Sequence, residues 1–180
     1  MTRTNFTRRG VLAFAAVTPL SGCLGLASRA IGSAGNSVPD TVPADLSHAS
    51  LGVADSNETM DVVADADLTL VYFFATWCGP CEPQLENLHE VREEYDTETL
   101  AMRALSPEDD EELVADYWAD NDVDWPAAID PDSDLHAEFG VSVYPSLVLV
   151  DPDGEVRWHT SGVAEVEEIT DEIDAALDAE

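Results

Sequence analysis

The sequence predicts an α/β fold, a three-layer sandwich in which a central mixed β-sheet is flanked by helices. Two observations carry this prediction. In the middle of the chain, a continuous apolar run, a helix-like pattern and a second apolar run follow one another, which is the order of a parallel βαβ unit. Towards the end, two strand-like runs joined by a tight turn precede another helix-like pattern. Strands and helices in this order form one sheet covered by helices.

The first predicted strand, residues 68–75 (LTLVYFFA), is short and continuously apolar, as expected of a strand buried on both faces. A helix is predicted over about residues 80–95. Its apolar face repeats at helical spacing, and its opposite face is acidic. The apolar face consists of Leu85, Leu88, Val91 and Tyr95. A second strand is predicted over residues 99–105.

Residues 106–109 (SPED) predict the start of the next helix, with Ser106 as the N-cap, a proline at the first helical position and an acid at the third. Four side chains are expected to pack this helix on the core: Leu113, Val114, Tyr117 and Trp118. Residues 125–129 (WPAAI) are predicted as a connecting segment, and a small helix is expected around residues 135–139.

The C-terminal part predicts a hairpin and a last helix. Residues 146–150 (SLVLV) form the expected buried strand, residues 151–154 (DPDG) supply the turn, and residues 155–160 return as the hairpin partner. The last helix carries its apolar side chains on one face: Val166, Ile169, Ile173, Ala176 and Leu177.

The segment Trp77-Cys78-Gly79-Pro80-Cys81 lies where the first strand gives way to a helix. Two cysteines separated by two residues can close and reopen a small disulfide ring, and so carry two electrons. A thiol in the first turn of a helix ionises more easily, because unpaired N–H groups and the helix dipole favour the anion, and only the thiolate attacks a disulfide. The pattern therefore predicts thiol–disulfide chemistry with Cys78 as the nucleophile.

Three other interpretations compete for these cysteines. A zinc site needs two further ligands, but the other cysteine is Cys23, and the histidines at positions 48, 89, 136 and 159 lack paired spacing. We therefore expect no metal. A purely structural disulfide rarely bridges so short a loop, because the small ring removes little entropy from the unfolded chain. A chance occurrence is the third alternative.

A second feature is the pair Tyr144-Pro145, which precedes the strand at residues 146–150. A proline that opens a strand after a loop is suited to a cis peptide bond, although a trans proline at a strand edge fits these residues equally well. In the cis form it would expose the backbone of Tyr144 beside the cysteines, where an extended substrate segment could pair with it.

The N-terminus predicts export and anchoring. In residues 1–22, Arg8-Arg9 precede an apolar stretch that is too short to span a bilayer, which resembles a twin-arginine export signal. The end of this stretch resembles a lipobox, in which Cys23 becomes the lipidated first residue. An ordinary signal with an incidental cysteine is the alternative. Residues 23–45 then comprise the lipidated cysteine and a flexible Gly-, Ser-, Ala- and Pro-rich tether, and residues 46–180 form one domain on the outer face of the cell membrane.

The charge of the chain is extreme. Seven arginines and no lysine stand against 38 acidic residues, which gives a net charge of −31. Such a surface is similar to that of extreme halophiles, and its self-repulsion disfavours the compact state unless salt screens it. We expect no nucleic-acid partner, because seven arginines among 38 acidic residues offer few basic groups for phosphate contacts.

With these elements in place, the chain resembles the thioredoxin superfamily, most closely its membrane-anchored, extracytoplasmic TlpA/ResA-type thiol–disulfide oxidoreductases. The likeness covers about residues 50–178. It rests on four segments: residues 71–81, Trp125-Pro126 before Asp130-Pro131, Phe139-Gly140-Val141 running into Tyr144-Pro145, and residues 149–154.

The resemblance implies a thioredoxin-like fold and a role for each residue of the motif. Cys78 attacks the partner disulfide and Cys81 resolves the mixed disulfide. Pro145 is cis and faces the cysteines, and Trp77 flanks them. The redox-active pair Cys78–Cys81 needs no other cofactor.

The chain departs from this family where a proton acceptor for Cys81 is usual. Thioredoxins carry a buried Asp six residues before the nucleophile, and here that residue is Tyr72. Membrane-anchored relatives often have Glu and Pro three and five residues after the second cysteine, and here these are Gln84 and Glu86. Glu82, Glu86 or water could serve instead.

We therefore predict an extracytoplasmic oxidoreductase that reduces disulfides of exported proteins, apocytochrome c among them. The Gly-Pro dipeptide resembles that of reducing thioredoxins. A membrane electron donor would recharge the dithiol, and we expect a monomer. The alternatives are a disulfide oxidase or isomerase on the same fold, a non-catalytic tethered metal- or partner-binding module, and a peroxidase, for which the nearest upstream arginine is Arg29 in the tether.

Overall fold

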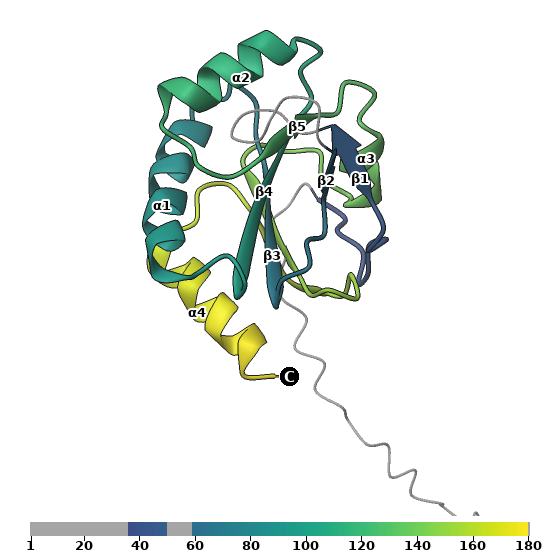
Figure 1. Ribbon diagram of the computed structural model, residues 1–180, viewed down its shortest axis with the longest axis vertical. Helices are drawn as coiled ribbons and strands as arrows, with labels where there is room; N and C mark the ends of the chain where they lie inside the picture. The colour runs from purple at the N-terminus through teal and green to yellow at the C-terminus, as the bar shows by residue number, and fades with distance from the viewer. Residues whose placement is uncertain (1–35, 50–58, 180) are drawn as a thin grey trace, which may run out of the picture.

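The computed structural model describes residues 36–49 and 59–179 (Figure 1). Its central sheet has five strands in the order β5-β4-β3-β6-β7. Their bounds are β3 (Leu68–Phe73), β4 (Leu100–Ser106), β5 (Ala127–Ile129), β6 (Ser146–Val150) and β7 (Val156–Ser161). The helices are α1 (Cys81–Glu94), α2 (Glu111–Asp120), α3 (Asp134–Glu138) and α4 (Val166–Leu177). A separate antiparallel pair joins β1 (Ser47–Ala49) to β2 (Thr59–Asp61).

The sheet is mixed, as predicted. β3, β4 and β5 are parallel to one another, and β6 is antiparallel to both β3 and β7. Phe73 at the end of β3 lies opposite Leu105 in β4 and Ser146 in β6. The ends of β3 and β4 and the beginning of β6 therefore meet at one edge of the sheet.

Helices cover both faces of the sheet, which confirms the three-layer sandwich. Figure 1 shows α1, α2 and α4 on one side of the strands, and α3 with the β1–β2 pair on the other. Side chains of β3 alternate between the two apolar clusters. Tyr72 belongs to the cluster under α1, α2 and α4, and Phe73 belongs to the cluster under α3.

The prediction for residues 106–109 was wrong. Ser106 remains in β4, because it pairs with Ile129 of β5 and its carbonyl accepts the N–H of Asp130 at 2.7 Å. Helix α2 begins only at Glu111, and the side chain of its N-cap Asp110 accepts from the N–H of Leu113 at 3.2 Å. Leu113, predicted to pack on the core, is exposed.

Residues 127–129, predicted as part of a connecting segment, form strand β5. The residues themselves give little signal, since alanine has low strand propensity. Their pairing with residues 104–106 of β4 makes them a strand.

Residues 36–45 differ from the flexible tether that the sequence predicts for residues 23–45. Thr41 forms a bridge with Glu155 beside β7, and Val42, which is buried, donates its N–H to the carbonyl of Gly154 at 2.8 Å. The side chain of Asn36 donates to the hydroxyls of Ser146 and Ser161. We call residues 36–42 the N-terminal strap. Its apolar and polar contacts fix it to the sheet.

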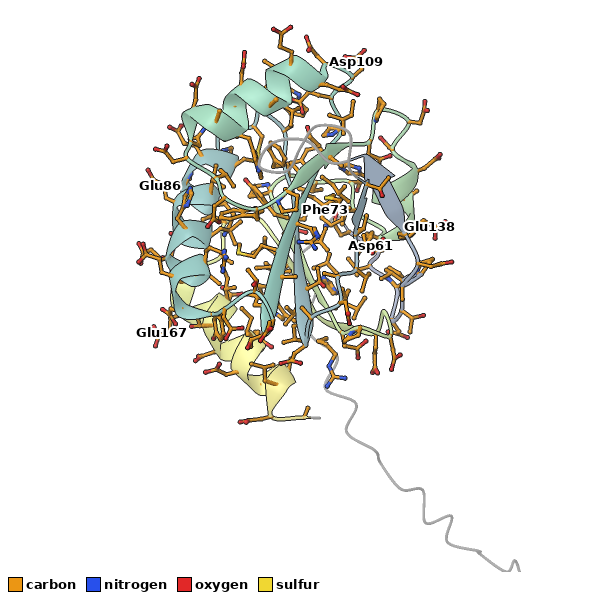
Figure 2. The ribbon with its side chains drawn as sticks, viewed as in Figure 1. Asp61, Phe73, Glu86, Asp109, Glu138 and Glu167 are labelled. Carbon is orange, nitrogen blue, oxygen red and sulfur yellow. A yellow bond between two sulfur atoms is a disulfide. The ribbon has the colours of Figure 1, made fainter. Side chains whose placement is uncertain are left out.

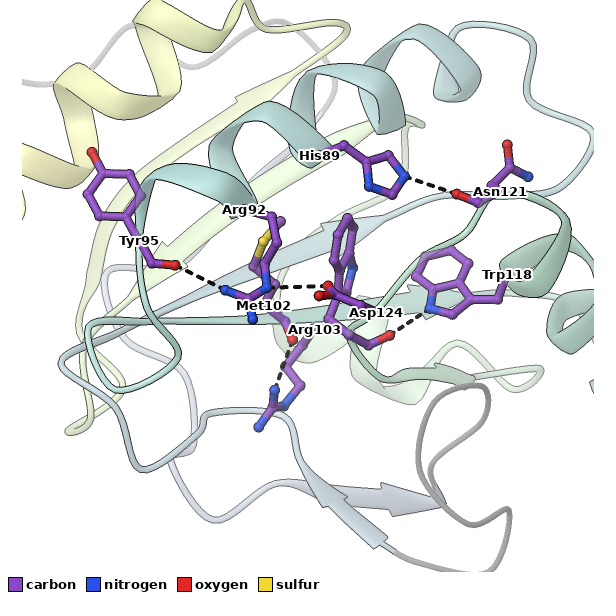
Figure 3. Close-up of polar contacts among 9 residues, drawn as sticks. His89, Arg92, Tyr95, Met102, Arg103, Trp118, Asn121 and Asp124 are labelled. Carbon is purple, nitrogen blue, oxygen red and sulfur yellow. Dashed lines mark hydrogen bonds and ion pairs between the residues drawn. The ribbon is translucent and has the colours of Figure 1, made fainter.

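The far end of α1 is held by contacts with the segment between α2 and β5 (Figure 3). The ring of His89 hydrogen-bonds the carbonyl of Asn121 at 3.1 Å, and the guanidinium of Arg92 pairs with Asp124 at 3.3 Å. The indole of Trp118 donates to the carbonyl of Trp125 at 2.7 Å. These contacts fix the direction of α1, and hence the place of its first residue, Cys81.

The acidic side chains cover the outside of the molecule. Figure 2 shows Glu86, Asp109, Glu138 and Glu167 pointing away from the fold, while Phe73 lies within it. Of the helices in the described part of the chain, none has the length and apolar character needed to cross a bilayer.

Candidate active site

The two cysteines of the motif are joined as a disulfide at the turn between β3 and α1. Their Cα atoms lie 5.4 Å apart. The turn is closed by two backbone hydrogen bonds, from the N–H of Cys78 to the carbonyl of Ala75 and from the N–H of Cys81 to the carbonyl of Cys78. Cys81 is wholly buried, whereas Cys78 is 9 % exposed. A partner disulfide can therefore reach the sulfur of Cys78 more easily than that of Cys81.

The loop that contains Tyr144 and Pro145 lies beside the motif. The Tyr144–Pro145 peptide bond is cis, as the resemblance implies. The ring of Tyr144 lies edge-on to that of Trp77, with ring centres 6.0 Å apart. The carbonyl of Pro145 accepts the N–H of Gly162 at 2.9 Å. The structure thus places Tyr144, one of the predicted supporting residues, against Trp77 of the motif.

The side chain of Trp77 is 69 % exposed, and Val143 and Val163 are exposed as well. Gly79 also lies open, because a Cβ atom built on it meets nothing within 4 Å. Large exposed apolar side chains often mark an interaction surface. The face around Cys78 is therefore suited to contact another protein.

Neutral groups occupy the two positions where the family usually has an acid. The hydroxyl of Tyr72 donates to the carbonyl of Cys81 at 2.8 Å, and burial, with the charge of Tyr117 adding to it, raises the pKa of this phenol. The amide of Gln84, also buried, accepts from the N–H of Ala164 at 2.7 Å and donates to the Ala164 carbonyl at 3.5 Å. Both side chains therefore connect the start of α1 to neighbouring segments.

The two glutamates considered as substitutes, Glu82 and Glu86, are exposed on α1. Figure 2 shows Glu86 pointing away from the fold. The structure gives neither carboxylate a hydrogen bond to the buried Cys81.

One carboxylate at this site was missed in the sequence. Glu108 follows β4 and accepts from the backbone N–H of Thr76 at 2.8 Å and from the hydroxyl of Thr76 at 2.5 Å. Its second oxygen contacts the hydroxyl of Ser106. The available signal was the parallel pairing of β3 and β4, because residues that follow parallel strands meet at one edge of the sheet.

A buried acid–base pair was also missed. One carboxylate oxygen of Asp130 lies 2.6 Å from the Nδ1 of His136 and accepts the backbone N–H of His136 at 2.9 Å. Burial opposes ionisation of Asp130, but these hydrogen bonds outweigh it and lower its pKa. The His136 ring lies edge-on to the ring of Tyr144, with ring centres 5.6 Å apart. The Asp130–His136 pair therefore packs against the loop of the cis proline.

The predicted lipid anchor and the arginines that a peroxidase would need are the remaining points. Cys23 falls outside the described residues. Arg92, Arg103 and Arg157 contact Asp124, the carbonyl of Asp61 and the carboxylates of Asp151 and Glu155, respectively. Within residues 36–49 and 59–179, no three His, Cys, Asp or Glu side chains gather as metal ligands would.

Comparison with known proteins places the chain among redox proteins. The family model described as Redoxin matches residues 33–177. A thiol-disulfide oxidoreductase ResA of Bacillus thuringiensis is 29% identical over 90 residues, which cover 50% of this chain and 52% of that protein. The sporulation thiol-disulfide oxidoreductase A of Bacillus subtilis is 20% identical over 103 residues, which cover 56% of this chain and 62% of that protein. The match thus spans about half the length of the ResA relative.

Solved structures share the fold at lower identity. StoA from Bacillus subtilis matches with a TM-score of 0.58 and 18% identity, covering 68% of this chain and 93% of that one. A putative thiol:disulfide interchange protein DsbE from Chlorobium tepidum matches with a TM-score of 0.65 and 20% identity, covering 78% of this chain and 99% of that one. These findings confirm the resemblance to ResA-type proteins of the thioredoxin superfamily. The chain belongs to the Redoxin family.

Proposed function

We propose that the protein is an extracytoplasmic thiol–disulfide oxidoreductase that reduces disulfides of exported proteins. The observation that carries this proposal is the disulfide itself. It joins a cysteine that reaches the surface to one that is wholly buried, and it lies beside a cis-proline loop. This asymmetry suits a cycle in which one sulfur meets the partner and the other releases it.

In the proposed cycle the reduced protein gives two electrons to its partner. The Cys78 thiolate attacks one sulfur of the partner disulfide, that S–S bond breaks, and the first partner thiolate leaves and takes up a proton. The Cys81 thiolate then attacks the Cys78 sulfur and breaks the mixed disulfide. The second partner thiol departs, and the Cys78–Cys81 disulfide remains.

The setting follows from the N-terminal sequence and the resemblance. A lipid on Cys23 holds the domain on the outer face of the cell membrane, exported proteins such as apocytochrome c supply the disulfides, and a membrane electron donor returns the protein to the dithiol form. The exposed Trp77 and Val143 offer an apolar surface to such partners. We further propose that the protein acts as a monomer.

Single-cysteine variants test the order of attack. Cys81→Ser should accumulate a mixed disulfide with an oxidised partner peptide, because the resolving thiol is gone, whereas Cys78→Ser should not. The readout is a mass shift that disappears on reduction. Equal trapping by both variants, or by neither, would contradict the assigned roles.

A redox titration tests whether the protein reduces or oxidises its partners. The domain is equilibrated with glutathione in molar KCl, and Cys78 and Cys81 are followed by thiol alkylation. A potential well below that of glutathione supports a reductant. A potential well above it makes the protein an oxidase on the same fold, and failure to form the internal disulfide at any potential removes the catalytic role.

A further inference from the structure

Glu108 occupies a place that the sheet itself determines. Strands β3 and β4 are parallel, and Phe73 lies opposite Leu105. The residues that follow these strands therefore leave the sheet side by side. On β3 these residues lead into the motif, and on β4 they lead to Glu108.

Both oxygens of the Glu108 carboxylate are engaged by groups that donate. One accepts from the N–H and the hydroxyl of Thr76, and the other contacts the hydroxyl of Ser106. The hydroxyl oxygen of Ser106 in turn accepts the N–H of Glu108 at 3.4 Å. Thr76 directly precedes Trp77 and lies two residues before Cys78. The carboxylate is thus fixed at the entrance of the motif and is half-buried there.

The charge of Glu108 acts on two tyrosines, one of which, Tyr144, lies against Trp77 of the motif. Burial, then Asp130, then Glu108 raise the pKa of Tyr144 in the cis-proline loop. Burial, then Glu82, then Glu108 raise the pKa of Tyr117 in α2. Glu108 is the acid common to the two tyrosines, and it is the one bonded to the segment that enters the motif.

We propose that Glu108 is a positioning residue of the redox site: its hydrogen bonds with Thr76 and Ser106 fix its negative charge at the entrance of the motif, where that charge opposes the Cys78 thiolate. A thiolate that is less stable makes the reduced pair a better electron donor, because the disulfide form is then relatively favoured. Glu108 therefore shifts the Cys78–Cys81 pair in the reducing direction. This inference rests on the proposed reductant function and supplies a physical cause for it.

The test is Glu108→Gln, measured in full-length protein in molar KCl. Glutamine keeps an oxygen that can accept the N–H of Thr76, but it has no charge. We expect the pKa of Cys78 to fall, so that its alkylation at pH 6 becomes about threefold faster. The equilibrium constant for oxidation of the dithiol by glutathione should fall by about the same factor.

Two matched variants separate the charge from other effects. Asp109→Asn removes the same charge from the next residue, whose side chain is exposed. Thr76→Val removes one hydrogen bond and leaves the carboxylate in place. We expect both to leave the Cys78 pKa and the glutathione equilibrium close to those of the wild-type protein.

The inference is overturned if Glu108→Gln shifts the Cys78 pKa no more than Asp109→Asn does, or if Thr76→Val shifts it as much as Glu108→Gln. A wild-type potential above that of glutathione would refute the proposed direction of the reaction. The threefold change in the alkylation rate of Cys78 in Glu108→Gln would still be measurable in that case. A failure of the proposed function can therefore be told apart from a failure of the role of Glu108.

Discussion

Two neutral side chains make the buried hydrogen bonds at the start of α1, whereas the carboxylate of this site bonds the segment before the cysteines. Tyr72 and Gln84 bind the backbone of Cys81 and of Ala164, and Glu108 binds Thr76 at the entrance of the motif. A buried charge without a partner is costly, whereas a buried hydroxyl or amide with its hydrogen bonds made is tolerated. Cys81 is thus buried next to neutral groups, whereas Cys78 reaches the solvent and lies two residues after the segment that Glu108 binds.

Tyr72→Phe removes the hydroxyl that bonds the Cys81 carbonyl. We expect it to lower the free energy of unfolding by about 1 kcal/mol, because one buried hydrogen bond is lost. Urea unfolding in molar KCl measures this change. Tyr117→Phe, which removes the hydroxyl of a half-buried ring, is the control and should cost less. Equal losses of unfolding free energy in both variants would show that the hydrogen bond to the Cys81 carbonyl adds no stability of its own.

Asp130→Asn tests the buried pair with His136. Because the pKa of Asp130 is lowered in the folded protein, its ionised form contributes stability above the unfolded pKa, and this contribution is lost as the pH falls through the folded pKa. We expect the variant to lose about 2 kcal/mol at pH 7 and to approach the wild-type stability near pH 2. Unfolding curves at several pH values, with the exposed Asp132→Asn as the control, measure the difference. A loss independent of pH would contradict this account.

At the scale of elements, the N-terminal strap depends on two glycines that the chain approaches closely. Gly154 has a φ of +82°, and a Cβ atom there would lie 2.1 Å from the carbonyl oxygen of Val42. Gly140 has a φ of +64°, and its Cβ would lie 2.2 Å from the carbonyl oxygen of Ser37. Both positions therefore need a residue without a side chain, because the strap passes directly over them.

Gly154→Ala should displace the strap from the turn between β6 and β7. We expect a loss of about 3 kcal/mol, since the φ strain of about 1 kcal/mol is joined by a clash with backbone. Gly162→Ala is the control, because its φ is +92° but nothing lies within 4 Å of the added Cβ. Unfolding in molar KCl should show the larger loss for Gly154→Ala. Similar losses of stability in the two variants would mean that the close approach of the strap to Gly154 does not contribute to the effect.

The elements that could be predicted are those whose own residues carry a pattern. Residues 146–150 are continuously apolar, and the last helix repeats its apolar side chains at helical spacing. Strand β5 could not be predicted, because Ala127–Ile129 become a strand only by pairing with β4. Ser106 has the sequence marks of an N-cap, yet the same pairing keeps it in the sheet.

In the candidate site, too, some residues could be predicted from the sequence and others could not. Spacing alone indicates Cys78 and Cys81, because their chemistry is local. Glu108 gives no local signal, since it lies 32 positions after Thr76 and only the parallel pairing of two strands brings them together. His136 and Asp130 are only six positions apart, and the sequence predicts the short helix α3, but it does not show that this helix turns the imidazole towards the carboxylate.

Among the described residues, most acidic side chains lie on the outside and an apolar core lies within, with Asp130 as a buried acid. A net charge of −31 on a chain of 180 residues makes self-repulsion large. Apart from the Arg92–Asp124 and Arg157 contacts, few basic groups of the described residues offset it. Dissolved cations must then supply most of the screening.

We expect the melting temperature to rise by on the order of 10 °C between dilute buffer and 2 M KCl, because at molar salt the Debye length is only about 3 Å. Thermal unfolding followed by circular dichroism measures it. Sorbitol at matched osmolality is the control for effects other than ionic screening. A melting temperature unchanged by KCl would contradict the halophilic interpretation of the surface.

The strap also sets how far the protein can work from a membrane. Asn36 is bound to Ser146 and Ser161, so the chain is attached to the sheet from that residue onward. If Cys23 carries a lipid, twelve residues lie between the anchor and Asn36, and the thirteen Cα–Cα steps from Cys23 to Asn36 span at most about 45 Å when fully extended. The disulfide would then search a thin zone above the bilayer, where its encounters depend on how densely that surface is populated rather than on diffusion through the surrounding fluid.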